Sequence, residues 1–150
     1  MTVTVASGTG RGRAPVHLWI VGVLALLWNG MGAFDYLATK LKLDFYMSQF
    51  SPEQLAYFYG FPAWAVSGWA FGVWGAFVGS VLLLLRTRWA VWAFAVSLAG
   101  MVVSSIYTLG LSNGAEIMGT VGMVFSAVIW VVAIFLLVYS RKQATAGVLR

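Results

Sequence analysis

Hydrophobic residues fall into four long blocks, separated by short polar segments. The blocks cover residues 16–36, 61–85, 89–111 and 117–139. A helix crosses the hydrocarbon core of a bilayer with about 20 residues, so each block is long enough to span one. The alternation of apolar and polar residues that is typical of strands does not occur. The pattern predicts an all-α integral membrane protein, a four-helix up-down-up-down bundle over residues 15–139.

The segment between the first two blocks carries its own helix signals. Ser51 is a favourable N-cap, Pro52 suits the first helical position, and Gln54 completes a capping box. We therefore expect a short interfacial helix over residues 52–59, in the outer loop between spans 1 and 2.

This helix is rich in aromatic side chains, which favour the headgroup level of a bilayer. They are Tyr57, Phe58 and Tyr59. One interpretation is a lid that lies flat on the membrane and closes the bundle. The other is a docking surface for a second membrane protein or an amphiphilic ligand.

Small residues recur at steps of three and four along each block, which aligns them on one helical face. Because lipid does not drive helices together, close approach over small residues must hold a bundle together. We expect this role for Gly68, Gly72, Gly75, Gly79, Gly100 and Gly122.

Asn29 is the one side-chain amide within the first block, on the same face as its small residues. It stands seven residues before position 36, a depth of about 10 Å at the helical rise. Serines at similar depth predict a polar layer of Asn29, Ser67, Ser104, Ser105, Tyr107 and Ser126. The layer can be structural, with Asn29 hydrogen-bonded across a helix interface, or it can line a small cavity.

The composition is typical of a membrane protein, and the distribution of Lys and Arg predicts how it is oriented in the membrane. The chain is 61% hydrophobic and 9% charged, whereas soluble domains carry about 25% charged residues. Seven of the nine Lys and Arg residues lie before the first block, between the second and third, or after the fourth. This bias predicts cytoplasmic termini.

The ends of the chain, residues 1–14 and 140–150, are predicted to be disordered cytoplasmic tails, and the basic ones among their residues can rest on anionic lipids. The basic residues form no continuous patch, so nucleic acid is not an expected partner. A cleaved signal peptide is an alternative for the first block, although residues 28–34 continue as plausible helix and contain no Ala-x-Ala site.

Candidate catalytic chemistry is sparse. The chain has no cysteine and one histidine, His17. His17 and Asp35 lie 18 residues apart on one helix, which separates them by about 27 Å. We expect no catalytic residue, no metal site and no cofactor. Asp35, with Lys40 and Glu53, is expected at the outer rim, where a carboxylate reaches water or pairs with a lysine.

Three stretches resemble a group of small four-span bacterial membrane proteins, some of which carry the label "sugar transporter". The stretches are WNGMGAFDY, YMSQFSPEQLAYFYGFPAW and VWGAFVGSVLLLLRTRWAVWAFAVSLAGM. The resemblance runs from about Trp28 to Tyr107. It implies a bacterial inner-membrane location and transfers no catalytic or substrate-binding residue.

Two functional hypotheses follow. The first is a non-enzymatic inner-membrane bundle, an accessory or stabilising subunit that acts through helix-face and outer-loop contacts. The second is a small-solute transporter or channel that works as a homo-oligomer, because four short spans enclose little space.

Overall fold

The computed structural model describes residues 14–149, and that part of the chain contains helices and no strand. The helices are α1 (Val16–Lys40), α2 (Asp44–Met47), α3 (Pro52–Tyr59), α4 (Ala63–Leu84), α5 (Trp89–Ser105), the π-helix η1 (Ile106–Leu111) and α6 (Gly114–Thr145). Four helical stretches are long and apolar enough to cross a membrane: α1, α4, α5 with η1, and α6. The predicted all-α class with four candidate spans is confirmed.

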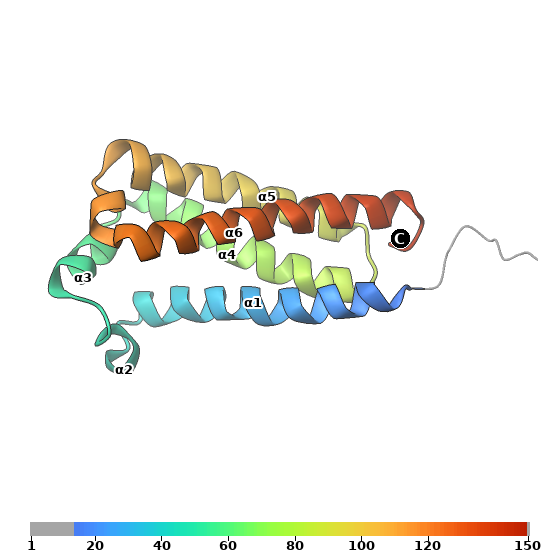
Figure 1. Ribbon diagram of the computed structural model, residues 1–150, viewed down its shortest axis with the longest axis horizontal. Coiled ribbons are helices and arrows are strands. Elements are labelled where there is room, and N and C mark those ends of the chain that lie inside the picture. Colours follow the sequence, from blue (N-terminus) through green and yellow to red (C-terminus); the bar gives the residue numbers. More distant parts are fainter. Residues whose placement is uncertain (1–13, 150) are drawn as a thin grey trace, which may run out of the picture.

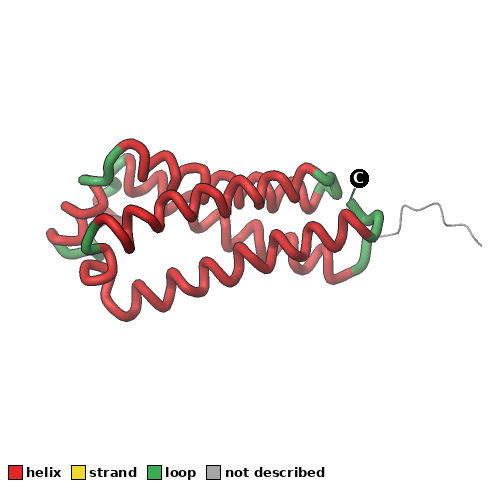
Figure 2. Tube along the Cα trace, turned by 90° about the horizontal axis from the view of Figure 1, so that it is seen from above, coloured by secondary structure: helices red, strands yellow, loops and turns green. Residues whose placement is uncertain are grey.

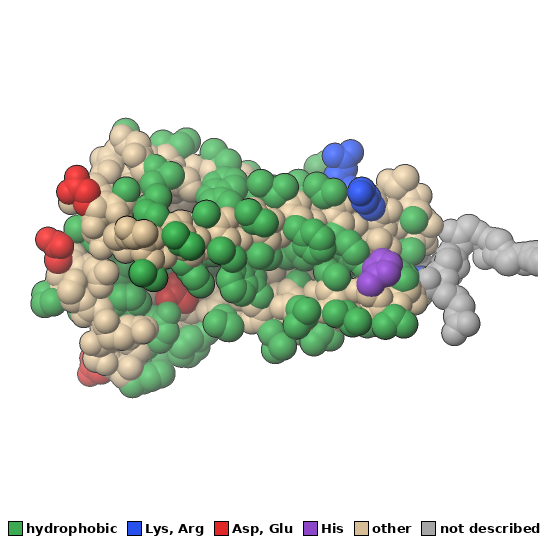
Figure 3. Space-filling view, viewed as in Figure 1, with side chains coloured by type: hydrophobic (Ala, Val, Ile, Leu, Met, Phe, Trp, Pro, Cys, Tyr) green, Lys and Arg blue, Asp and Glu red, His purple; other side chains and the backbone are tan. Residues whose placement is uncertain are grey.

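The long helices lie alongside one another, and the chain reverses direction from each to the next (Figure 1). Residue 14 and the C-terminal residues lie at one end, which we call the termini end. The short helices α2 and α3 lie at the opposite end, the loop end (Figures 1 and 2). On the face shown in Figure 3, carboxylates gather toward the loop end, and the visible Lys and Arg side chains lie toward the termini end.

The signals read for the short loop helix are correct in detail. The hydroxyl of Ser51 accepts from the Gln54 backbone N–H at 3.1 Å, and the Gln54 side chain accepts from the Ser51 N–H at 3.0 Å. Pro52 opens the helix and Gly60 ends it. This reciprocal cap satisfies two backbone donors that a short exposed helix would otherwise leave unpaired.

Two helices run past the predicted block ends. α1 continues from residue 36 to Lys40, and Ala38 and Thr39 in this extra turn are buried. α6 starts at Gly114 and continues beyond residue 139 to Thr145. Hydropathy marks where a helix leaves apolar surroundings, whereas the polar residues Arg141, Lys142 and Gln143 are good helix formers that carry α6 onward.

The expectation of a disordered tail over 140–150 is wrong for residues up to 149. After α6, Gly147 takes a positive φ of 81°, which turns the chain back. Val148 and Leu149 are then buried against the bundle. Of the N-terminal segment 1–14, only Ala14 is described, and it packs against the same core, while residues 1–13 lie outside the described range.

The buried core lies at the termini end. Its members are Leu18, Ala25, Leu83, Ala90, Phe94, Leu136, Val148 and Leu149. They come from α1, α4, α5, α6 and the final turn. Large apolar side chains therefore join the long helices at this end, whereas α4 and α5 meet over glycines nearer the middle.

α6 bends near its start. Gly119 has φ 71° and ψ −174°, which are not helical values, and a Cβ at this position would have no atom within 4 Å. A left-handed φ is accessible to glycine at little cost and is strained for other residues. The bend redirects α6 where it leaves the loop end.

Candidate functional site

Asn29 pairs with a residue that the sequence patterns did not single out. Its side-chain amide nitrogen donates to the hydroxyl oxygen of Ser80 on α4 at 2.8 Å. Ser80 is fully buried and donates in turn to the carbonyl oxygen of Ala76 at 2.9 Å. This chain of two hydrogen bonds joins α1 to α4. The sequence signal that could have indicated Ser80 is its position as a polar residue just before a run of leucines in an apolar block.

The other members of the predicted polar layer lie elsewhere. A Cβ placed on Gly68 would lie 2.9 Å from the backbone nitrogen of Ser104, so Ser104 is level with Gly68. Gly68 and Ser80 stand twelve positions apart on one helix, a rise of about 18 Å. Asn29 and Ser104 therefore do not share a level. Measuring depth from residue 36, when α1 runs on to Lys40, accounts for about 6 Å of this difference. The rest comes from where α1 and α5 lie along α4.

The remaining serines of that set make local contacts or none. Ser67 donates to the carbonyl oxygen of Ala63 in its own helix and is exposed. Within residues 14–149, the hydrogen bonds include none from the hydroxyls of Ser104, Ser105 or Ser126. Tyr107 lies at the loop end among aromatic rings. The predicted layer is not assembled as one site.

The rim residues follow a different pairing from the one expected. Asp35 accepts a hydrogen bond from the hydroxyl of Tyr46 in α2. Lys42 stands 4.6 Å from the ring centroid of Tyr59, a cation–π contact. Burial, followed by the hydrogen bond to Asp35, raises the pKa of Tyr46 above its ordinary value of 10.0. Lys40 and Glu53 are exposed.

The glycines of α4 form the closest helix contact in the bundle. Cβ atoms built on Gly68, Gly72, Gly75 and Gly79 all come within 3.3 Å of α5. A Cβ at Gly100 would lie 2.6 Å from the carbonyl oxygen of Gly68. Ser97, which is buried, adds a hydrogen bond to the carbonyl oxygen of Gly72 at 2.6 Å. For Gly122 the nearest atoms belong to Met118 of its own helix.

The aromatic residues of α3 turn toward the bundle. The hydroxyls of Tyr57 and Ser112 are 2.6 Å apart, and Ser112 donates to the carbonyl oxygen of Tyr107, so Tyr57 is the donor between the hydroxyls. The rings of Tyr57 and Phe61 are 5.3 Å apart. Phe58 packs on Phe50 at 5.3 Å. These contacts attach α3 to η1 and to the start of α4, and of the three aromatics proposed for docking only Tyr59 is classed as exposed.

α6 is the least covered of the long helices. Within its most apolar 18-residue stretch 6% of residues are buried, against 28% in α1 and α4 and 22% in α5 with η1. A shallow hollow of about 480 Å³ lies on its exposed side. Small or flexible side chains line most of it, including Ala115, Gly119, Thr120, Met123 and Ala127.

α6 contacts α1 through side chains near the termini end and the middle. His17 Nδ1 and the Tyr139 hydroxyl are 2.5 Å apart. The rings of Trp28 and Phe125 are 5.7 Å apart. These contacts give His17 a partner on α6, far from the carboxylates of the loop end (Figure 3).

The sequence matches no protein-family model, and comparisons with curated proteins and with solved structures find no match. Among residues 14–149, no group of three or more His, Cys, Asp or Glu side chains could hold a metal ion. What the fold defines is a class, a helical protein with four helices suited to crossing a membrane.

Proposed function

We propose that the chain is a non-enzymatic accessory subunit of a membrane complex, and that α6 is the helix that meets the partner. The observation that carries the proposal is the exposure of α6, of which so little is buried within the bundle. In this proposal the four spans insert up-down-up-down, with both termini on the cytoplasmic side of a bacterial inner membrane and α3 at the opposite interface.

The character of the exposed face supports a protein partner. Lipid can cover any apolar face, but small residues line most of the hollow around Gly119 and let the backbone of another helix come close, while Glu116, Met123 and Val124 complete its lining. Val121, 84% exposed, stands beside it as a large apolar side chain available for packing. The partner we propose is therefore a membrane-spanning helix with an apolar, small-residue face.

The contacts of α3 make the outer loop a less suitable partner surface than α6. Tyr57 and Phe58 are occupied by contacts with Ser112, Phe50 and Phe61. Their positions favour the interpretation of α3 as a lid. Tyr59 and Lys42 remain as the accessible part of this surface.

The competing hypothesis is a transporter or channel built from several copies, in which Asn29 would line the solute path. The bond from Asn29 to Ser80 gives that amide a structural partner and favours the accessory role. A transporter would need other polar groups along the path.

Photo-crosslinking in the native membrane tests the proposal. A photoreactive residue at Thr120 should give an adduct with a foreign membrane protein, identified by mass spectrometry. The matched control is Leu24 on α1, which is 61% exposed and should give lipid adducts only. If Thr120 also gives only lipid adducts, the accessory role of α6 is rejected. Adducts with a second copy alone would favour the transporter, and flux through Asn29→Leu in liposomes would be measured next.

A further inference from the structure

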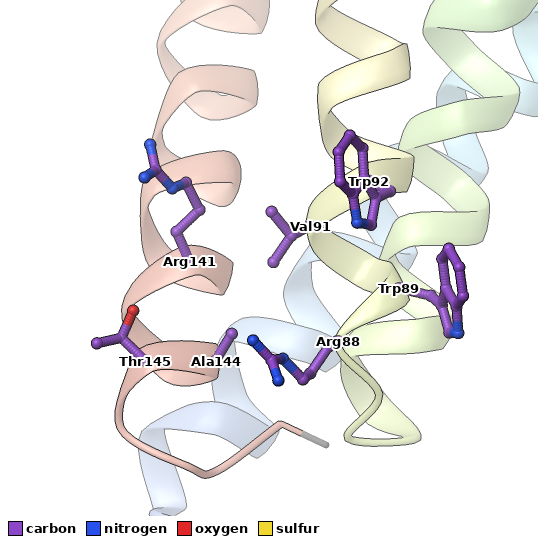
Figure 4. Close-up of a pocket in the computed structure, with 7 residues that line it drawn as sticks. All are labelled: Arg88, Trp89, Val91, Trp92, Arg141, Ala144 and Thr145. Atoms are coloured by element: carbon purple, nitrogen blue, oxygen red, sulfur yellow. The ribbon is translucent and has the colours of Figure 1, made fainter.

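A groove between the start of α5 and the end of α6 opens at the termini end (Figure 4). Its volume is about 450 Å³. Arg88 and Arg141 line it from the two helices, together with Trp92, Val91 and Thr145. Figure 4 shows the side chain of Arg88, which directly precedes α5, extending toward Ala144 on α6, whereas the Arg141 side chain extends along α6 away from Arg88. Two cations on separate helices thus share one concave surface.

The two guanidinium groups have no partner among the described residues. Arg88 and Arg141 are both exposed and neither takes part in a hydrogen bond or an ion pair within residues 14–149. The four acidic side chains of the chain lie at or near the loop end: Asp44 and Glu53 in α2 and α3, Asp35 in the last part of α1 and Glu116 in the first turn of α6. The groove therefore carries positive charge that no side-chain carboxylate neutralises.

The groove combines this charge with an apolar wall. Trp92 is 66% exposed and Val91 is half-buried, and tryptophan favours the level where headgroups meet acyl chains. Guanidinium groups bind phosphate oxygens through paired, charge-assisted hydrogen bonds. Basic pockets between membrane helices on the cytoplasmic side are suited to anionic lipid headgroups. The required ligand is an anion with an attached apolar chain.

We propose that this groove is a binding site for one anionic phospholipid, with Arg88 and Arg141 as the basic side chains that attract its headgroup and an acyl chain against Val91 and Trp92. Attraction of anionic lipid to basic tails in general requires no particular residue. The site, in contrast, requires the two arginines that line the groove. It depends on α5 and α6 only and is independent of any partner protein at Thr120.

The test compares arginines inside the groove with a lysine next to it. Lys142 follows Arg141 in the chain, is exposed, and does not line the groove. Wild type, Arg88→Gln, Arg141→Gln and Lys142→Gln are purified in detergent with phosphatidylglycerol or phosphatidylcholine, and retained lipid is counted by native mass spectrometry. Thermal unfolding of each variant checks that the bundle is intact, which we expect because these side chains are exposed.

We expect the wild type to retain one phosphatidylglycerol per chain and little phosphatidylcholine. Each arginine substitution should lower retention about fivefold, the effect of one basic residue at a lipid surface, while Lys142→Gln changes it by less than about twofold. Thr145→Trp, which fills the groove and keeps every charge, should also release the lipid.

Three results would overturn the proposal. The first is an equal loss in Lys142→Gln, which would mean that charge alone attracts the lipid. The second is equal retention of phosphatidylcholine. The third is release of the lipid by inorganic phosphate at the same concentration, which would make the ligand a soluble anion.

Discussion

The side-chain amide of Asn29 donates to the hydroxyl of Ser80 across 2.8 Å and so joins α1 to α4 inside an apolar interface. The Ser80 hydroxyl donates in turn to the Ala76 carbonyl oxygen, so the Asn29 amide nitrogen and the Ser80 hydroxyl both have partners. Deep in a bundle with few charges, such a pair sets how two helices align.

Replacing Asn29 with Leu should lower the free energy of unfolding by about 0.6–2 kcal/mol, the range for a hydrogen bond between membrane helices. Ser80→Ala should cost a similar amount, and the double variant less than the sum, because both changes remove one interaction. Denaturant titration of the four proteins in detergent measures this coupling. Additive effects would mean that the two side chains act independently.

Gly100→Ala should destabilise the α4–α5 contact by about 1–3 kcal/mol, the usual cost of overpacking. The new methyl group would meet the backbone of Gly68 and Gly72, each at 2.6 Å, and a backbone cannot move aside as a flexible side chain can. Gly32→Ala is the matched control, because its Cβ meets only Val73 Cγ1, at 3.8 Å. Thermal unfolding in the same detergent should leave Gly32→Ala at or above the wild type, and equal losses would contradict the packing argument.

Tyr57→Phe should loosen the attachment of α3 to the bundle. It removes the hydrogen bond to Ser112 and keeps the ring contacts, at a cost of about 0.5–1.5 kcal/mol. Hydrogen exchange of the α3 amides should then accelerate about two- to tenfold. Tyr59→Phe serves as control, since the hydrogen bonds of the described residues include none from the Tyr59 hydroxyl. Faster exchange in both variants would point to a general weakening of the loop.

The contact between Tyr46 and Asp35 should make the protein lose stability in alkali. The pKa of Tyr46 is higher in the folded protein than in the unfolded chain, so its contribution is complete below pH about 10 and is lost as pH rises further through the folded pKa. Tyr46→Phe lacks this contribution. Its unfolding temperature should lie below that of the wild type at pH 8 and fall less steeply above pH 10; parallel curves would show that Tyr46 does not titrate in the contact.

Leu149→Ala should destabilise the bundle, although Leu149 lies beyond the last helix. Leu149 is 2% exposed in a core with Leu18, Leu83 and Leu136, and truncating a buried leucine costs about 2–5 kcal/mol. Leu27→Ala is the control, because Leu27 is 62% exposed. Chemical unfolding should show a clearly lower free energy of unfolding for Leu149→Ala than for Leu27→Ala. An unchanged value for Leu149→Ala would mean that this segment does not contribute to the core.

Part of the glycine arrangement could be predicted and part could not. Gly68 and Gly72 stand four apart in an apolar block, which is enough to expect a close helix contact. The identity of the neighbour depends on how helices rotate against one another. Gly100 therefore packs against Gly68 and Gly72 of α4. Gly122, which follows the bend at Gly119, has only Met118 of its own helix as a near neighbour.

The polar residues show the same division. Asn29 could be assigned to an interface from its place on the small-residue face, but its partner, Ser80, was not among the residues of the predicted layer. Residues on two helices can be matched in level only when the positions of both helices along the bundle are known, and α1 is also longer than its hydrophobic block. The arginines of the groove were assigned to orientation, and only the approach of α5 and α6 brings Arg88 and Arg141 to one surface.

The sequence by itself determined the helical class, the four candidate spans and the capped helix over Pro52–Tyr59, because these depend on hydropathy and on contacts a few residues apart. Tertiary structure alone decided the partner of Asn29, the inward position of Tyr57, the burial of Leu149 and the exposure of α6. Those features join residues far apart in the chain. They depend on the relative rotation and axial position of whole helices in the bundle. A local sequence pattern specifies neither.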